Sequence, residues 1–139
     1  TDMTIFFRML GTVLKHETAE QGLDKIKDAF YNIAELTEVL EDKWKAWFIL
    51  YLDRLKLESE DDQNRKENMN AINPKYVFRN YMAQMATDLA DKGDYSLIET
   101  FSKLFKHPYK EQPEFEQWFA KRPEWARHKV GCSQLSCSS

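Results

Sequence analysis

Apolar residues recur at three- and four-residue spacings along most of the chain, which is the pattern of amphipathic α-helices. Asp2 is placed to cap a first helix, whose predicted inner face is Ile5, Phe6, Met9, Leu10, Val13 and Leu14. A second helix is predicted from about Leu23 to Leu36, with Leu23, Ile26, Ala29, Phe30, Ile33 and Ala34 pointing inward. A third, near Glu41 to Leu57, is expected at the centre of the core because its inner face is Trp44, Trp47, Phe48, Tyr51, Leu52 and Leu55.

The remaining helices are marked by capping and breaking residues. Ser59, with Asp62 three positions later, predicts a short polar helix that reaches Asn70. Asn73 as N-cap and Pro74 in the first turn predict a helix that ends at Gly93. A further helix follows Asp94 or Ser96 and is broken by Pro108, and Pro113 begins a short helix with Phe115, Trp118 and Phe119.

No segment has the alternating pattern of a β-strand, so the predicted fold class is all-α, with six to eight helices in one compact domain. Residues 1–126 are expected to form this helical domain, and residues 127–139 a flexible, polar, cysteine-containing tail. The residues expected to be buried are Trp47, Phe48, Tyr51, Tyr81 and Phe101.

Charge and composition argue against several classes of partner. The net charge of −3 does not suit a nucleic-acid-binding surface, and no apolar run approaches the roughly 20 residues that span a bilayer. We therefore expect neither nucleic acid nor membrane as a partner. Two cysteines near one end do not form a disulfide framework, so we expect a reducing compartment: the cytoplasm, or the mitochondrion in a eukaryote.

The sequence offers few groups for chemistry. It has no glycine-rich phosphate loop, and its three histidines lack zinc-site spacing, so we expect no catalytic, cofactor-binding or metal-binding residue here. The acidic stretch from Glu58 to Asp62 could suggest a metal site, but acids at a helix start more simply complement the helix dipole. Lys75, Arg79 and Asn80 are expected either on a solvated helix face or in contact with another domain.

The tail carries Cys132 and Cys137 among polar residues. Thiols in a mobile polar segment are expected to be exposed, and Arg127, His128 or Lys129 would lower the pKa of a thiol that they approach. The two cysteines are therefore candidate redox residues. The alternative is an unremarkable end of the chain.

Several blocks of the sequence resemble the selenoprotein O family. They are Met69-Asn70-Ala71-Ile72-Asn73-Pro74-Lys75-Tyr76, Arg79-Asn80-Tyr81-Met82-Ala83-Gln84, Lys92-Gly93-Asp94, His107-Pro108-Tyr109, Arg122-Pro123-Glu124-Trp125 and Cys137-Ser138-Ser139. The resemblance implies a kinase-like protein that moves AMP from ATP onto protein side chains, using magnesium or manganese. Family members are several times longer, with the ATP and metal sites in an N-terminal kinase-like part, so these residues would be the C-terminal piece.

The resemblance also assigns roles to particular residues. Asn73, Pro74, Lys75, Arg79 and Asn80 become a family motif that could contact the missing kinase-like part, the expected partner beside the parent's protein substrates. Cys137 matches the family's redox-active position, with its thiol partner either Cys132 or a cysteine in the missing part.

Two other functions remain open from the sequence: a stand-alone helical interaction module, or a small thiol oxidoreductase working through Cys132 and Cys137. If the chain is the C-terminal piece of a longer protein, we further expect it to expose an apolar or arginine-rich surface that the parent protein buries.

Overall fold

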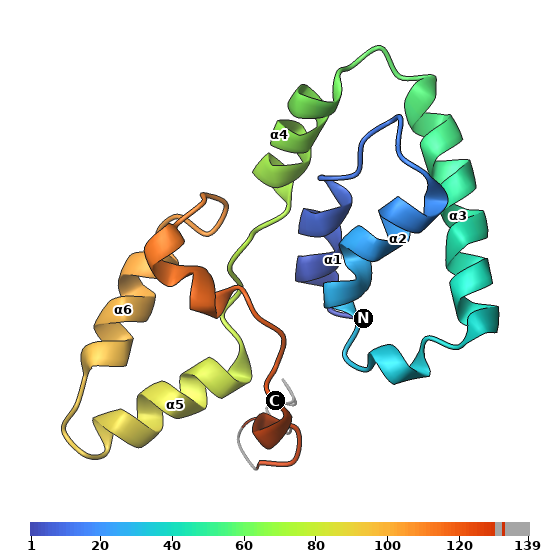
Figure 1. The fold of residues 1–139 in the computed structure, drawn as a ribbon. Helices are drawn as coiled ribbons and strands as arrows, with labels where there is room; N and C mark the ends of the chain where they lie inside the picture. Colours follow the sequence, from blue (N-terminus) through green and yellow to red (C-terminus); the bar gives the residue numbers. More distant parts are fainter. Residues whose placement is uncertain (130–131, 133–139) are drawn as a thin grey trace, which may run out of the picture. The chain divides into compact units, whose positions relative to one another are not determined.

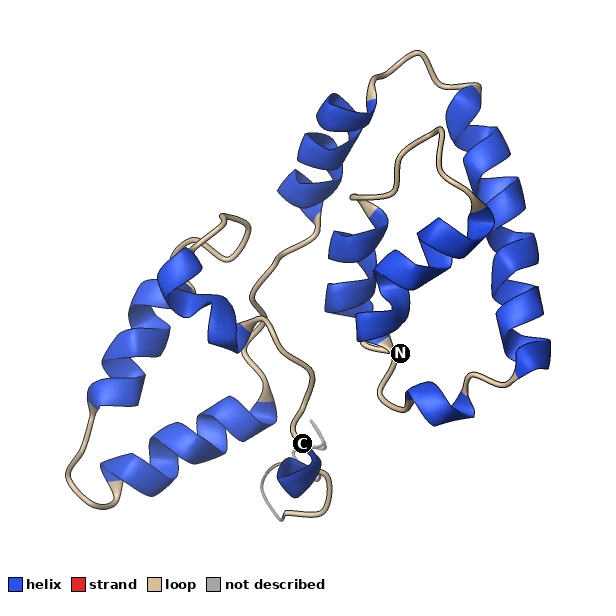
Figure 2. Cartoon of the chain, in the orientation of Figure 1, coloured by secondary structure: helices blue, strands red, loops and turns tan. Residues whose placement is uncertain are grey.

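The computed structural model describes residues 1–129 and Cys132, and all regular structure within them is helical (Figures 1 and 2). The α-helices are α1 (Met3–Leu10), α2 (Ala19–Ile26), α3 (Glu38–Lys56), α4 (Asp62–Ile72), α5 (Asn80–Ala90) and α6 (Ser96–Leu104). Short 3₁₀ helices are η1 (Lys27–Ala29), η2 (Ile33–Glu35), η3 (Pro113–Trp118) and η4 (Glu124–Ala126). The predicted all-α class is therefore confirmed.

The described helices fall into two compact units, one formed by Thr1–Lys75 and the other beginning at Tyr76. The assignment of residues 1–126 to one domain stays a prediction, as does the flexible tail, most of which lies outside the described residues. No helix within the described part is long and apolar enough to cross a membrane.

In the first unit, α1 and α2 pack together, α3 packs on α2, and α4 packs on α1 (Figure 1). The predicted cap at Asp2 is confirmed, because its Oδ1 accepts a hydrogen bond from the Ile5 amide at 3.2 Å. Thr18 and Gln21 form a capping box at the start of α2, each side chain bonding the other's backbone N–H. Local hydrogen bonds therefore define where both helices begin.

Helices α2 and α3 pack closely at Gly22. A Cβ atom at Gly22 would lie 2.6 Å from the Phe48 ring, which is fully buried. Only a residue without a side chain lets the ring lie this close to the α2 backbone. Phe48 is thus confirmed as a core residue, whereas Trp47 is 38% exposed and stacks on half-buried Tyr51 at the edge of the core.

The predicted second helix is wrong in its second half. α2 ends at Ile26, η1 follows, and Phe30 has an extended backbone. The Asn32 side chain then accepts a hydrogen bond from the Ala34 amide at 3.0 Å, which offers the backbone a local alternative to helix. As a result Ile33 and Ala34 are exposed rather than buried.

The predicted helix start at Asn73 and Pro74 is also wrong. Asn73 instead ends α4, with ψ at 107°, and α5 does not begin until Asn80. A residue before proline is disfavoured in the α region, so Pro74 terminates the preceding helix. Likewise, the residue that caps α4 is Asp61 rather than Ser59.

The second unit is built around α5 and α6. Its core contains the expected Tyr81 and Phe101, together with Tyr76, Met82, Ala86, Leu104, Ala126 and Cys132. Phe101 packs edge-on against Trp118 of η3, with ring centroids 4.7 Å apart. Gly93, at φ +82°, lies in the turn after α5 as predicted, and the expected short helix at Pro113 is η3.

Gly22→Ala is expected to destabilise the chain by about 1–3 kcal/mol, because the added methyl group overpacks the Phe48 ring. Urea unfolding followed by circular dichroism measures the change. Gly11→Ala is the matched control, since its nearest contact to a new Cβ is an ordinary 3.4 Å. Equal stability of the two variants would contradict the close packing at Gly22.

Candidate functional site

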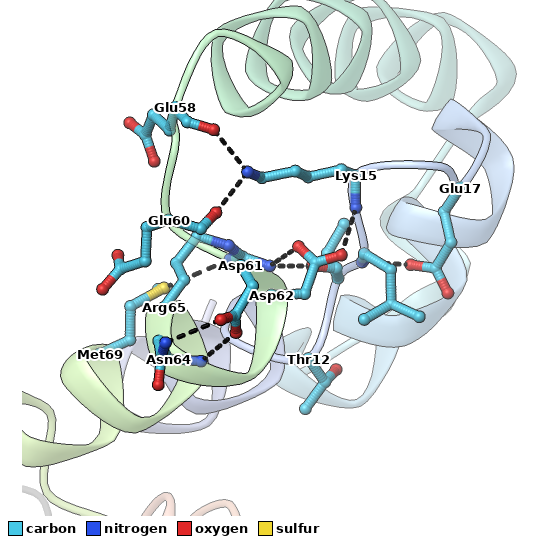
Figure 3. Close-up of polar contacts among 12 residues, drawn as sticks. Thr12, Lys15, Glu17, Glu58, Glu60, Asp61, Asp62, Asn64, Arg65 and Met69 are labelled. Carbon is cyan, nitrogen blue, oxygen red and sulfur yellow. Dashed lines mark hydrogen bonds and ion pairs between the residues drawn. The ribbon is translucent and has the colours of Figure 1, made fainter.

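The acidic stretch that could have suggested a metal site forms the turn between α3 and α4 (Figure 3). Asp61 caps α4, with its Oδ1 accepting from the Asn64 amide at 2.8 Å and its Oδ2 from the Asn64 side chain at 2.7 Å. This local role agrees with the simpler prediction of acids stabilising a helix start.

Lys15 occupies the space inside this turn (Figure 3). Its Nζ donates to the Glu58 carbonyl at 2.7 Å and also to the Glu60 carbonyl, while its backbone N–H donates to Asp62 Oδ2 at 3.1 Å. The carbonyl oxygens that a cation could use are therefore bound by an ammonium group. Within the described residues, no group of three His, Cys, Asp or Glu side chains is arranged to hold a metal ion.

Arg65 connects the start of α4 to the segment after α1. Its guanidinium donates to the Val13 carbonyl and forms an ion pair with Asp62 at 3.1 Å, and Arg65 is only 4% exposed. Burial alone would raise the pKa of Asp62. The hydrogen bonds from the Lys15 amide and Arg65, helped by both positive charges, outweigh burial and hold the pKa of Asp62 below its usual value.

The family motif lies where the two units join along the chain. On the first side, Asn73 donates its backbone and side-chain N–H groups to the Met69 carbonyl, at 2.9 and 2.8 Å. Arg8, itself buried, donates to the carbonyls of Asn70 and Asn73 at 3.3 and 3.2 Å. Asn73 is thus a helix end held by α1.

On the second side, Tyr76 is buried and anchored twice. Its amide donates to the Pro108 carbonyl at 3.0 Å, and its hydroxyl donates to the Gln112 carbonyl at 3.0 Å. Lys75, directly before Tyr76, is buried, which goes against a solvated helix face, one of the two alternatives for it; Arg79, three residues after Tyr76, is half-buried. Asn80 is exposed in the first turn of α5.

Of the two candidate redox cysteines, the structure describes Cys132. Cys132 is 3% exposed and belongs to the core of the second unit, so the expectation of an exposed thiol is wrong for it. The preceding segment is held on α5 by an ion pair between Lys129 and Asp88 at 2.6 Å, and the hydrogen bond from Lys129 lowers the pKa of Asp88. Cys137 lies outside the described residues.

Sequence reasoning missed the buried cations Arg8 and Arg65. Arg8 lies on α1 and Arg65 on α4, and the sequence assigned a role to neither. Their acceptors are backbone carbonyls more than 50 residues away, Asn70 and Asn73 for Arg8 and Val13 for Arg65, and no local pattern encodes such a pairing.

Asp62→Asn is expected to lower stability at pH 7 by roughly 1–3 kcal/mol, because Arg65 loses its buried counter-ion. Since folding lowers the pKa of Asp62, its charge stabilises the fold above the ordinary carboxyl pKa of about 4 and ceases to do so as pH falls through the lower folded value. The difference between wild type and variant should therefore shrink at acidic pH.

Urea unfolding from pH 7 to pH 3 checks this expectation. Asp53→Asn provides the control, because Asp53 makes only an exposed ion pair with Lys56 at 3.0 Å on α3. A stability loss in Asp62→Asn that stays constant across the pH range would contradict the role of the charge.

Comparison with known proteins identifies the relatives of the chain. A family model described as protein adenylyltransferase SelO matches residues 1–106. A protein nucleotidyltransferase YdiU from Flavobacterium johnsoniae is 58% identical over the whole chain, which spans 27% of that relative. Proteins of the same name from Aromatoleum aromaticum and Methylobacillus flagellatus are 44% and 46% identical over 99% of the chain, which spans 26% of each. The chain therefore belongs to the SelO family of protein adenylyltransferases.

Proposed function

We propose that these residues form the helical C-terminal domain of a protein nucleotidyltransferase that transfers AMP from ATP to protein hydroxyl groups. In that reaction the hydroxyl oxygen bonds to the α-phosphorus and pyrophosphate leaves. Membership of the SelO family is the observation that carries the proposal. The ATP, the divalent magnesium or manganese ion and the catalytic residues belong to the remaining part of the parent.

The chemistry of the described residues supports placing the catalytic residues in the remaining part of the parent. Gly11, Gly22 and Gly93 are widely separated, so they do not form a loop that could cradle phosphates. The one dense acidic stretch is already bonded to Lys15, Arg65 and its own helix. The residues instead make structural contacts, which suits a domain that supports a catalytic partner.

The parent protein is expected to transfer radiolabelled AMP from α-labelled ATP to protein in the presence of magnesium or manganese. The 139-residue chain alone is expected neither to transfer AMP nor to bind ATP, because its described residues form no phosphate-binding loop and no cluster of metal ligands. Labelling on gels and titration calorimetry measure the two properties. An inactive parent, or a micromolar dissociation constant for ATP and the isolated chain, would contradict the proposal.

We further propose that Cys137 is the redox-sensitive position of the parent. Diamide takes two electrons and two protons from a pair of thiols, which then form a disulfide. In the parent, this oxidation should change the rate of AMP transfer. Cys137→Ser should abolish this response. Cys132→Ala should alter the response to diamide less, because the Cys132 thiol is buried. Alanine is chosen because it adds no polar group to the core.

Activity measured before and after diamide, and again after reduction, tests the redox proposal. Wild-type and Cys137→Ser proteins with the same response to diamide would show that Cys137 has no redox role. That outcome would leave the proposed nucleotidyltransferase activity intact.

A further inference from the structure

Helix α3 has apolar side chains on two opposite faces. Phe48, Leu52 and Leu55 point into the core of the first unit. On the opposite side, apolar residues recur at intervals of seven, four and seven positions, which places them in one line along the helix. We call this line the outer α3 stripe, and it consists of Val39, Ala46, Leu50 and Leu57.

The outer α3 stripe is uncovered in this structure. Val39, Leu50 and Leu57 are 64%, 71% and 80% exposed, and Ile49 beside them is 55% exposed. Singly exposed apolar residues are common, but Val39, Leu50 and Leu57 lie in one line along the helix, and Ile49 extends the exposed apolar surface to one side. Apolar residues in line on the outer side of a helix that already buries its inner face are those that a second partner could cover.

Charged residues border the stripe. Asp53 pairs with Lys56 at 3.0 Å, and Arg54 pairs with Glu58 at 3.4 Å, so both ion pairs lie at the surface of the helix beside Leu50 and Leu57. An apolar centre with a charged border is the usual anatomy of a protein–protein contact surface. The stripe is thus suited to an apolar protein surface rather than to a charged ligand.

We propose that the outer α3 stripe packs against the part of the parent polypeptide outside these 139 residues. This inference rests on the proposed function, in which these residues are one domain of a longer parent protein. The matched relatives contain a large remaining polypeptide, since the chain spans only 27% and 26% of the first two. A covalently linked partner is held at high effective concentration, so even a narrow stripe is enough for docking.

A second copy of the chain is a poorer occupant. From Val39 to Leu57 the stripe is roughly 27 Å long, and a helix is about 10 Å wide. One helix face of this size is well below the roughly 800 Å² per partner that stable protein–protein interfaces bury. A free dimer would therefore need further contacts, whereas a linked domain would not.

Thiol labelling of the full-length parent tests the proposal. Leu50→Cys and Val39→Cys each place one thiol on the stripe, and Gln63→Cys places a control thiol on the exposed surface of α4. Mass spectrometry of the peptides follows alkylation by N-ethylmaleimide and separates the new thiols from native cysteines. We expect both stripe thiols to react at least about tenfold more slowly than the control, with the difference lost in denaturant.

Protection that is unchanged on dilution supports docking to the same polypeptide. Protection that disappears on dilution identifies a second copy as the occupant and overturns the proposal. Stripe thiols that react as fast as Gln63→Cys overturn it as well. AMP transfer by the unmodified parent is measured separately, so an inactive parent with a protected stripe would contradict the proposed function alone.

Discussion

The buried guanidinium of Arg65 is the interaction on which the arrangement of the first unit depends. It reaches from α4 to the Val13 carbonyl just after α1, and Asp62 neutralises it. A charge buried this deeply costs free energy unless it is paired and hydrogen-bonded, so the segment around Val13 and the start of α4 are constrained to meet. Lys15 then follows two residues later and closes the turn between α3 and α4 through the Glu58 carbonyl.

The same use of buried cations recurs at the other end of α4. Arg8 donates to carbonyls at the last turn, where a helix leaves acceptors without partners in its own ladder. The two arginines thus hold both ends of α4 against the segment that contains α1. This explains how a helix with few apolar residues is fixed in place, since directed hydrogen bonds replace much of the usual hydrophobic contact.

Hydrogen bonds to backbone carbonyls also explain the family motif. Asn73 completes the end of α4 in the first unit, and three residues later Tyr76 is bonded to the Pro108 and Gln112 carbonyls in the second. Each unit therefore anchors its own end of a short extended connection. Within the described residues, the motif therefore forms the connection between the two units along the chain.

The sequence by itself determined the features whose causes lie within a few residues: the all-α class, the cap at Asp2, the long α3, the turn at Gly93 and the short helix at Pro113. It also carried the family motif. It failed where two local signals competed, as at Asn73 and Pro74, whose capping pattern suits a helix start although the residue before a proline equally suits a helix end. The tertiary structure alone decided that Arg65 and Cys132 are buried and that Trp47 lies at the edge of the core. These outcomes depend on acceptors and packing partners far away in sequence, which a local periodicity does not encode.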